Sequence, residues 1–505
     1  MIDQRIQPAI CAALVLFFLV AASRGLAENY SYWSDELWSV SASRADWGVL
    51  LRDWLIPDTH PPLYQTLLKL WIGSGGSGER ATRSLSLLMA GIGLVATALF
   101  ASGRGAGRRL VSVAFLGTSP AFLFYAQETR SYATSLALSA VLLGAAMELR
   151  QRRLGGSSNV LLARWGDPAL RGLFVLACLL LSLTHYVSLL FVLVVLAVAC
   201  AEGLVWRQRR QMLPLLLGVL SWPMVHLLSS SLATKLERLD WIQVTPISGT
   251  LSAFLSGTLP LLAPGRAGPE GLLLGALGVA MALVFAVTAV RRRPQPLAPV
   301  LPNPALGEAR FLLLAIGGFV ALMLLIDLVK PLSQARYAIV VLPALAYLCG
   351  DGWELGRHIS RPRRLALASL LAVWLLLQWQ LGQQELAEKR APLQNYKLMA
   401  AFVERSGICD GGCWSSGWLL EALSPLYVQP GQLQQAPEAL RDFAAPLERP
   451  FLGFHNAYRD LSTLRAANPD LACWEAPGAW RSAPFVLLPR TSSVQPARHG
   501  LRPCP

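Results

Sequence analysis

The chain has 505 residues, of which 54% are hydrophobic and 15% are charged, and its formal net charge is +14. A soluble globular domain usually has about 25% charged residues and fewer apolar ones, so this composition favours a protein that crosses a membrane several times. The basic residues occur in short clusters between apolar segments, a pattern typical of membrane topology. A nucleic-acid partner would instead require a basic surface patch, and we expect none.

The apolar segments predict an all-α polytopic membrane protein. A spanning helix needs about 20 mostly apolar residues. Eleven segments qualify approximately, at residues 6–27, 81–102, 110–126, 131–149, 172–184, 186–205, 212–231, 271–290, 309–329, 337–353 and 365–382. The stretch 172–205 also admits another division, and residues 1–27 have features of a secretory signal. The prediction is therefore about eleven transmembrane helices.

Arginine clusters give the orientation of these helices, because cytoplasmic loops retain Lys and Arg. Five clusters fall in alternate loops, at residues 104–109, 150–153, 207–210, 291–293 and 357–364. This predicts a plasma (inner) membrane protein with a cytoplasmic N-terminus. The loop 28–80, the turn 330–336 and everything after about residue 383 would then lie on the outer side.

The first outside loop, 28–80, is too patterned to be a simple connection. In RADWGVLLRDWLI, residues 44–56, apolar and charged residues alternate at helical spacing, which indicates an amphipathic helix in the plane of the membrane interface. Pro61 and Pro62 suit the first turn of a second interfacial helix. The glycine-rich segment 73–79 ends it before the second span.

The C-terminal part has a different character, and we divide the chain into a transmembrane module, 1–382, and an extracytoplasmic domain, 383–505. Shorter apolar segments such as PFLGF (450–454) and PFVLLP (484–489) indicate strands, so we expect a small α/β domain. Its four cysteines would lie in an oxidising compartment, where disulfides form. Three connectivities are open, of which Cys409–Cys413 with Cys473–Cys504 is the simplest.

Ionisable residues are scarce in the centres of the predicted spans and gather at their outer ends. Charges within the membrane would indicate an ion or proton pathway, whereas this distribution predicts a site at the outer membrane surface. The residues are Asp35, Glu36, His60, Glu128, Arg130, His185, Asp327, Lys330 and Arg336.

Structural interpretations of the same residues stay open on spacing alone. Asp35 suits a helix N-cap and Glu36 an ordinary first-turn acid. Lys330 and Arg336 suit side chains that extend along apolar surface to the membrane interface. His60 suits a turn, Glu128 and Arg130 an interfacial ion pair, and His185 an interior histidine with a satisfied hydrogen bond.

Five segments in order carry a resemblance to a known family. They are W-S-D-E-L-W-S (33–39), H-P-P-L-Y-Q-T-L-L-K-L-W (60–71), E-R-A-T-R-S-L-S (79–86), S-P-A-F-L-F-Y-A-Q-E-T-R-S-Y-A (119–133) and, more weakly, Q-A-R-Y-A-I-V-V-L-P (334–343). This order resembles the polyprenyl-phosphate-dependent glycosyltransferases of the GT-C fold. Within them it is most similar to the branch of protein O-mannosyltransferases, lipid A aminoarabinose transferases and related bacterial family 39 enzymes.

The resemblance implies a role for each matching residue. Asp35, with Glu36 beside it, would act on the acceptor. His60, Glu128 and Arg130 would surround the same cleft. Arg336, with Lys330, would bind the lipid phosphate, and His185 matches a histidine of relatives only loosely.

The chemistry of such a transfer agrees with these assignments. Arginine forks suit a phosphate whose negative charge grows as the sugar departs. An acceptor hydroxyl needs a carboxylate as general base, and one direct displacement inverts the anomeric centre. A retaining route would require a second carboxylate as nucleophile, for which Glu128 is the candidate.

Metal dependence stays open. Glu36, Glu128, His60 and His185 are candidate ligands of a divalent cation. No H-E-x-x-H or C-x-x-C spacing supports such a site independently, and no cofactor is certain.

The sequence thus yields the hypothesis of a membrane glycosyltransferase. It would move a sugar from a polyprenyl-phosphate carrier to a hydroxyl of a lipid, glycan or protein acceptor on the extracytoplasmic side. The alternative is a transporter or flippase of a lipid-linked substrate. A membrane scaffold that displays the C-terminal domain would leave the ordered polar residues of the first loop unexplained.

Overall fold

The structure is a computed structural model and describes the chain in two compact units. Residues outside the description are 1–6, 29, 59, 105, 154–158, 160–161, 205–208, 230–241, 243, 264–303, 357–359, 391–394, 416–425, 429–430, 436–448, 455–468, 476–483, 491, 493–494 and 505. The predicted span 271–290 and the arginine cluster 291–293 fall among them. The first unit, here called the helical unit, comprises residues 1–24, 46–74 and 83–386. The second, the loop–sheet unit, comprises residues 25–45, 75–82 and 387–505.

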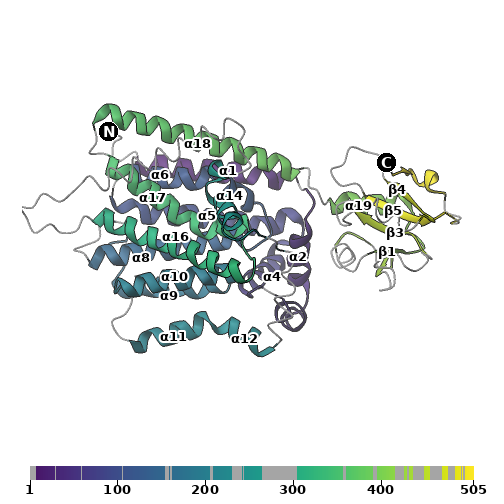
Figure 1. Ribbon diagram of the computed structural model, residues 1–505, viewed down its shortest axis with the longest axis horizontal. Coiled ribbons are helices and arrows are strands. Elements are labelled where there is room, and N and C mark those ends of the chain that lie inside the picture. Colours follow the sequence, from purple (N-terminus) through teal and green to yellow (C-terminus); the bar gives the residue numbers. More distant parts are fainter. Residues whose placement is uncertain are drawn as a thin grey trace, which may run out of the picture. The chain divides into compact units, whose positions relative to one another are not determined.

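The helical unit is built almost entirely of helices (Figure 1). They are α1 (Gln7–Glu28), α3 (Trp47–Val49), η1 (Leu50–Leu55), α4 (Leu63–Gly75), α5 (Glu79–Phe100), η2 (Ala101–Arg104), α6 (Ala106–Thr118), α7 (Pro120–Tyr125), α8 (Tyr132–Arg153), α9 (Asp167–Ser182), α10 (Tyr186–Ala201), α11 (Arg209–Val219), α12 (Ser221–Ser229), α14 (Ser248–Thr258), η3 (Pro260–Leu262), α16 (Pro304–Val329), η4 (Ala335–Val341), α17 (Leu342–Leu355) and α18 (Arg361–Arg390). Short end segments of α1, α5 and α18 belong to the other unit. The domain boundary predicted after residue 382 lies inside α18, because the helix-forming run QQELAEKR continues it.

Each predicted span in the described part of the chain coincides with a helix or with two helices that meet at a break. The span 110–126 is broken before Pro120, where α6 gives way to α7. The span 212–231 consists of α11 and α12, which are bent by 48°. Five described helices are long and apolar enough to cross a membrane, or six if the bent pair is one span. The number eleven therefore stays a prediction.

Burial differs sharply among the long helices. In the most apolar window of α8, 89% of the residues are buried, so this helix lies at the centre of the unit. The corresponding share is 28% for both α16 and α18, and leucines such as Leu325 and Leu376 are 63% and 65% exposed. Extensive apolar exposure of this kind is costly in water but favourable in lipid. The chain is a multi-pass membrane protein.

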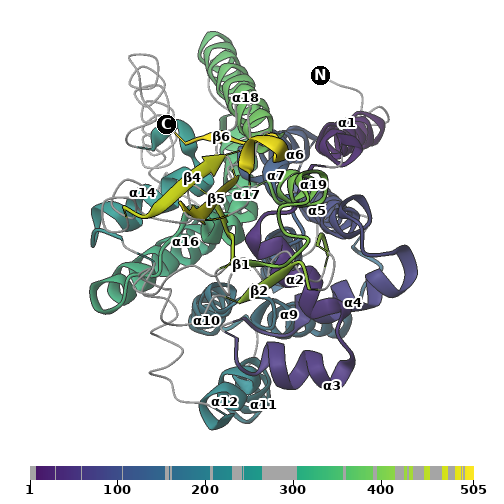
Figure 2. The same cartoon turned by 90° about the vertical axis from the view of Figure 1, so that its right-hand side faces the viewer.

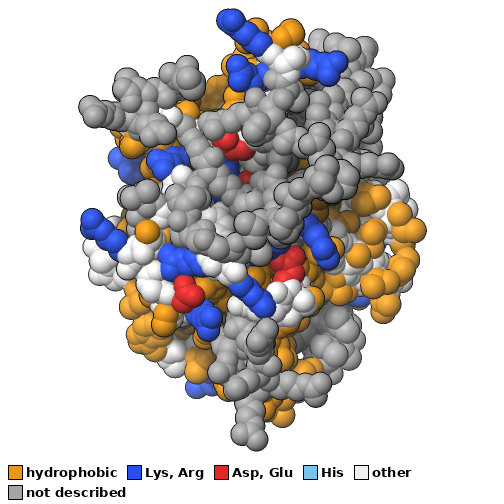
Figure 3. Space-filling view, turned by 90° about the vertical axis from the view of Figure 1, so that its left-hand side faces the viewer, with side chains coloured by type: hydrophobic (Ala, Val, Ile, Leu, Met, Phe, Trp, Pro, Cys, Tyr) orange, Lys and Arg blue, Asp and Glu red, His pale blue; other side chains and the backbone are white. Residues whose placement is uncertain are grey.

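One end of the helical unit is rich in basic side chains among the described residues. Figure 3 shows this end, with Lys and Arg side chains distributed over it. Exposed arginines there include Arg153, Arg361 and Arg363. Arg108, counted among the loop arginines in the sequence, is instead fully buried and pairs with Glu308 at 2.9 Å and Asp351 at 2.6 Å. It lies inside the bundle because two carboxylates from other helices compensate its charge.

The predicted amphipathic helix at 44–56 is realised as α3 followed by η1. Leu50 and Leu55 are buried, as the apolar face requires, whereas Trp47 and Leu51 are 53% and 47% exposed. The second helix, α4, begins at Leu63, so Pro61 and Pro62 directly precede its first turn, and it ends at Gly75, within the predicted glycine-rich segment. An interfacial position of these helices stays a prediction.

The loop–sheet unit contains α2 (Ser34–Arg44), α19 (Tyr396–Ser406), the short helix η7 (Pro496–His499) and a mixed six-stranded sheet (Figure 2). Its strands are β1 (Cys413–Ser415), β2 (Leu433–Gln435), β3 (Phe451–Phe454), β4 (Leu471–Glu475), β5 (Pro484–Pro489) and β6 (Arg502–Pro503). The strand order is β2-β1-β3-β5-β4-β6, with β1 parallel to β2 and β3 and the other pairs antiparallel. Both strands predicted from PFLGF and PFVLLP are present, and the fold is α/β as expected.

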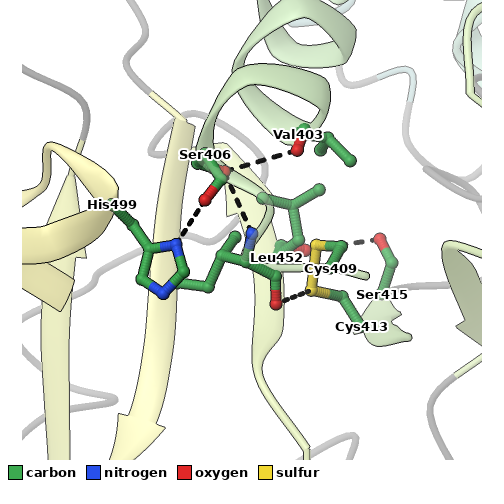
Figure 4. Close-up of a disulfide and its surroundings, with 8 residues drawn as sticks. Val403, Ser406, Cys409, Cys413, Ser415, Leu452 and His499 are labelled. Carbon is green, nitrogen blue, oxygen red and sulfur yellow. Dashed lines mark hydrogen bonds between the residues drawn. A yellow bond between two sulfur atoms is a disulfide. The ribbon is translucent and has the colours of Figure 1, made fainter. Parts of the chain in front are cut away.

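Two disulfides are present, and both match the simplest predicted pairing. Cys409–Cys413 closes the turn between α19 and β1 (Figure 4), and Cys473–Cys504 joins β4 to the chain after β6. Beside the first disulfide, His499 Nδ1 bonds the carbonyl of Ser406 at the end of α19. The C-terminal segment is thereby attached to both the sheet and the helix.

Candidate functional site

A histidine of the first loop is held between an acid and an arginine. The backbone N–H of His60 donates to Asp58 Oδ2 at 3.1 Å, and its ring Nδ1 lies 2.7 Å from the same oxygen. Its other ring nitrogen, Nε2, lies 3.2 Å from Arg130 Nη2. A guanidinium only donates hydrogen bonds, so Nε2 accepts, and Nδ1 carries the proton that goes to Asp58. The three side chains thus form one hydrogen-bonded series from two distant segments.

Arg130 comes from the tight turn between α7 and α8, whose residues are all buried. The turn is fixed by the Arg130 N–H, which donates to the carbonyl of Glu128 at 2.7 Å, and by Ser86 of α5, which bonds the same carbonyl. The side chains of Glu128 and Arg130 belong to residues only 3% and 4% exposed. The guanidinium carbon lies 5.9 Å from the centre of the Tyr132 ring, within the range of a cation–π contact.

His185 lies in the turn between α9 and α10, outside both helices. Its Nδ1 accepts a hydrogen bond from the Val187 N–H at 3.1 Å, which caps α10. In its neutral form Nε2 therefore carries the proton. Burial, and then the positive charges of Arg130 and Arg336, hold the pKa of His185 well below its usual value. At neutral pH it is an uncharged hydrogen-bond donor.

Aromatic rings join His185 to its neighbours. Its ring centre lies 5.3 Å from that of His60, 4.7 Å from Tyr337 and 6.5 Å from Tyr132. Three elements distant in sequence therefore meet at this histidine. We call the set of His60, Arg130, His185, Arg336 and the rings of Tyr132 and Tyr337 the cationic cluster.

Arg336 lies in η4, and an acid organises the turn before it. Asp327, near the end of α16, accepts from the N–H groups of Leu332 and Ser333 at 2.7 and 3.1 Å and from the Thr250 hydroxyl at 2.5 Å. These bonds fix the path of residues 327–335. Arg336 follows, half-buried, with its guanidinium carbon 5.6 Å from the centre of the Tyr337 ring.

An apolar groove adjoins the cationic cluster through Tyr337, which lines both. Its other walls come from α10, α14 and α16, with Val187, Phe254, Phe319 and Met323 among the lining residues. The polar side chains in its lining are Thr250, Ser333 and Gln334. An apolar surface next to arginine side chains is suited to an amphiphile with an anionic head.

Asp35 and Glu36 belong to the loop–sheet unit. The N-cap of α2 is Trp33, so Asp35 is not a cap but the second residue of the helix, and it is half-buried. Glu36 is fully buried, and its Oε2 accepts from the Trp33 N–H at 3.3 Å. The interpretation of Glu36 as a first-turn acid is therefore confirmed, whereas the N-cap interpretation of Asp35 is wrong.

The remaining predicted residues are Glu128 and Lys330. Glu128 lies in the same buried turn as Arg130, whose N–H bonds its carbonyl, so its backbone adjoins the cationic cluster. Lys330 directly follows α16 and is half-buried. The phosphate-binding role of Lys330 stays a prediction.

Within the described residues, no group of three or more His, Cys, Asp or Glu side chains is arranged to hold a metal ion. Both ring nitrogens of His60 already have partners, one of them an arginine, and a second cation at Nε2 would be repelled. His60 is therefore a poor metal ligand in this arrangement. The divalent cation stays an open prediction.

Sequence reasoning missed Asp58, Tyr132, Tyr337 and the organising role of Asp327. Asp58 carried a local signal, because an acid two residues before a histidine can bond its ring and its N–H together. The two tyrosines each follow a predicted arginine closely, but nothing in the sequence distinguished them from core aromatics.

Comparisons with known proteins bear on the fold of the chain. No protein-family model matches the chain, and no curated protein matches it. Among solved structures, the chain is similar to ArnT from Cupriavidus metallidurans in the apo state, with 14% identity, a TM-score of 0.56, and 95% of this chain and 98% of that chain covered. The chain has the GT-C fold.

The same fold is seen in ArnT from Cupriavidus metallidurans bound to undecaprenyl phosphate, with 13% identity, a TM-score of 0.55, and coverage of 94% of this chain and 97% of that chain. An oligosaccharyltransferase from Archaeoglobus fulgidus in the apo form is also similar, with 12% identity, a TM-score of 0.42, and coverage of 95% and 75%. The likeness to the two ArnT structures confirms the GT-C fold expected from the order of motifs.

Proposed function

We propose that the protein is a membrane glycosyltransferase that uses a polyprenyl-phosphate-linked sugar as donor. The observation that carries this proposal is the cationic cluster beside an apolar groove. Arg130 and Arg336 are fixed by their turns, and both contribute to the depressed pKa of His185. Lipid phosphate has the matching chemistry, an anionic head on an apolar chain. The likeness to ArnT with undecaprenyl phosphate supports the same substrate class.

The arginines would stabilise the leaving phosphate. Negative charge grows on the phosphate oxygens as the bond to the anomeric carbon breaks, and preorganised cations in a site shielded from water stabilise that charge strongly. Neutral His185 adds an N–H donor without adding charge. Because a guanidinium fork matches two phosphate oxygens, Arg336→Lys would preserve the positive charge but lose the ability to bind two oxygens at once.

Asp35 would act as the general base that takes the proton from the acceptor hydroxyl. A single displacement with one base inverts the anomeric centre. Glu36 already caps α2, so its part in this proposal is to fix the first turn of the helix that carries Asp35. The assay decides whether the sugar is a hexose or a pentose. It also decides whether the acceptor is a lipid, a glycan or a protein.

We propose an inner-membrane location with the arginine-rich end of the helical unit in the cytoplasm. The two disulfides of the loop–sheet unit support an oxidising compartment for the C-terminal segment. The positive-inside rule supports the same orientation.

The test uses purified protein with labelled polyprenyl-phosphate sugars and a panel of acceptors. A transferase makes a new glycoside, whereas a flippase only relocates the lipid between leaflets of a vesicle. Asp35→Asn should abolish transfer, and Arg336→Ala should raise the donor KM. Arg363→Ala, an exposed arginine at the other end of the unit, is the control. Relocation without a glycoside would replace the proposal by the transporter alternative.

A further inference from the structure

The loop–sheet unit contains a polar network that joins the C-terminal segment to the first outside loop. Its centre is Tyr427, whose hydroxyl donates to Glu79 Oε1 at 2.6 Å and accepts from the Tyr32 N–H at 3.3 Å. Burial, and then Glu79, raise the pKa of Tyr427, so the phenol keeps its proton. Lys397 Nζ lies 2.9 Å from the same Glu79 oxygen.

Tyr32 is held from both ends. Its own hydroxyl lies 2.6 Å from Thr82 Oγ1 and donates to the Ser77 carbonyl at 3.0 Å. Tyr32 as a whole is only 1% exposed. Its neighbour Ser31 accepts from the Lys397 N–H at 3.2 Å. The extended segment before α2 is thus bonded to residues of the C-terminal segment on successive positions.

The start of α19 is within electrostatic range of the proposed base. Tyr396, its first residue, is fully buried, and burial and then the negative charge of Asp35 raise its pKa. Because the Lys397 N–H also bonds Ser31, the start of α19 lies against the segment that leads into α2. The helix is anchored by Asn395, whose side chain accepts from the Leu398 N–H at 3.1 Å.

We propose that the C-terminal domain positions Asp35, through a latch formed by Tyr32, Glu79, Lys397 and Tyr427 together with Tyr396. This inference rests on the proposed function and gives the C-terminal domain a role in the transfer step. A general base must be held within fractions of an ångström of its productive geometry. The segment before α2 has no regular secondary structure of its own, so its path depends on these bonds. The latch residues are positioning residues.

The test compares variants of the full-length protein in lipid nanodiscs. Tyr427→Phe keeps the ring but removes the hydroxyl, and Lys397→Met removes the ion pair. Each is expected to lower kcat about tenfold, a factor typical of one lost hydrogen bond to a charged group, with the donor KM within about twofold of wild type. Amide exchange of residues 30–38, followed by mass spectrometry, is expected to accelerate in both. Lys397→Arg should restore kcat.

Arg405→Met is the matched control, because Arg405 lies on the same helix α19, is exposed, and donates from Nε to the Ala401 carbonyl of its own helix at 3.0 Å. It should leave kcat and exchange unchanged. Unchanged kcat and unchanged exchange in Tyr427→Phe and Lys397→Met would overturn the latch while leaving the proposed function intact. If wild type made no glycoside, the proposed function would fail, and the exchange measurement alone would decide the latch.

Discussion

The series Asp58–His60–Arg130 gives the sharpest quantitative prediction. In Asp58→Asn, the ring of His60 keeps a neighbour of the same size but loses the charged acceptor at 2.7 Å. Hydrogen bonds to charged groups contribute about 1.5–3 kcal/mol, and neutral ones about half as much. The half-buried position of the pair reduces the difference to roughly 1–1.5 kcal/mol, which corresponds to about a 5–15-fold loss in kcat/KM for the donor.

A double-mutant cycle identifies the route of this effect. Asp58 bonds the ring of His60, which in turn bonds Arg130. Once Arg130→Lys has altered the guanidinium, adding Asp58→Asn should therefore cost little more. The assay is initial-rate glycosyl transfer at varied donor concentration for wild type, both single variants and the double variant. Asp53→Asn, an exposed carboxylate of the same loop that pairs with Arg52 at 2.6 Å, should behave like wild type. Additive losses in the double variant would refute the series.

Two further predictions concern stability. The pKa of His185 is lower in the folded protein than in the unfolded chain, so protonation favours unfolding and stability is lost as the pH falls below about 6.5. Between pH 7 and pH 5, the melting temperature of His185→Gln should fall less than that of wild type. An equal fall would contradict the buried neutral state. Arg108→Met leaves Glu308 and Asp351 buried without their cation and should destabilise the protein by about 3–5 kcal/mol, measured as a lower melting temperature. Adding Glu308→Gln and Asp351→Asn should recover much of the lost stability. No recovery would count against the ion network.

The local pattern predicted more of the fold than of the site. Helices such as α5 and α8 are predicted from apolar segments whose length matches the thickness of a membrane. Such a segment can be recognised without knowing which distant residues it contacts. The strands at 450–454 and 484–489 also follow from local composition, whereas the sequence left three disulfide connectivities open and the structure has the simplest of them. The order of short motifs was sufficient to predict the GT-C fold, which the ArnT comparison confirms.

The tertiary structure alone decided which side chains meet. His60 and Arg130 lie 70 positions apart in sequence, and only the packing of α4, α5 and α8 brings their turns together. Arg108 resembled its loop neighbours in sequence, but partners on α16 and α17 make it a core residue. Tyr427 bonds Glu79 although the two residues lie 348 positions apart in sequence. The apolar pattern of the sequence does not predict such a contact. Apolar periodicity reflects a solvent boundary that each segment meets independently, whereas a polar site depends on directional bonds between segments whose approach is fixed only when the whole core is packed.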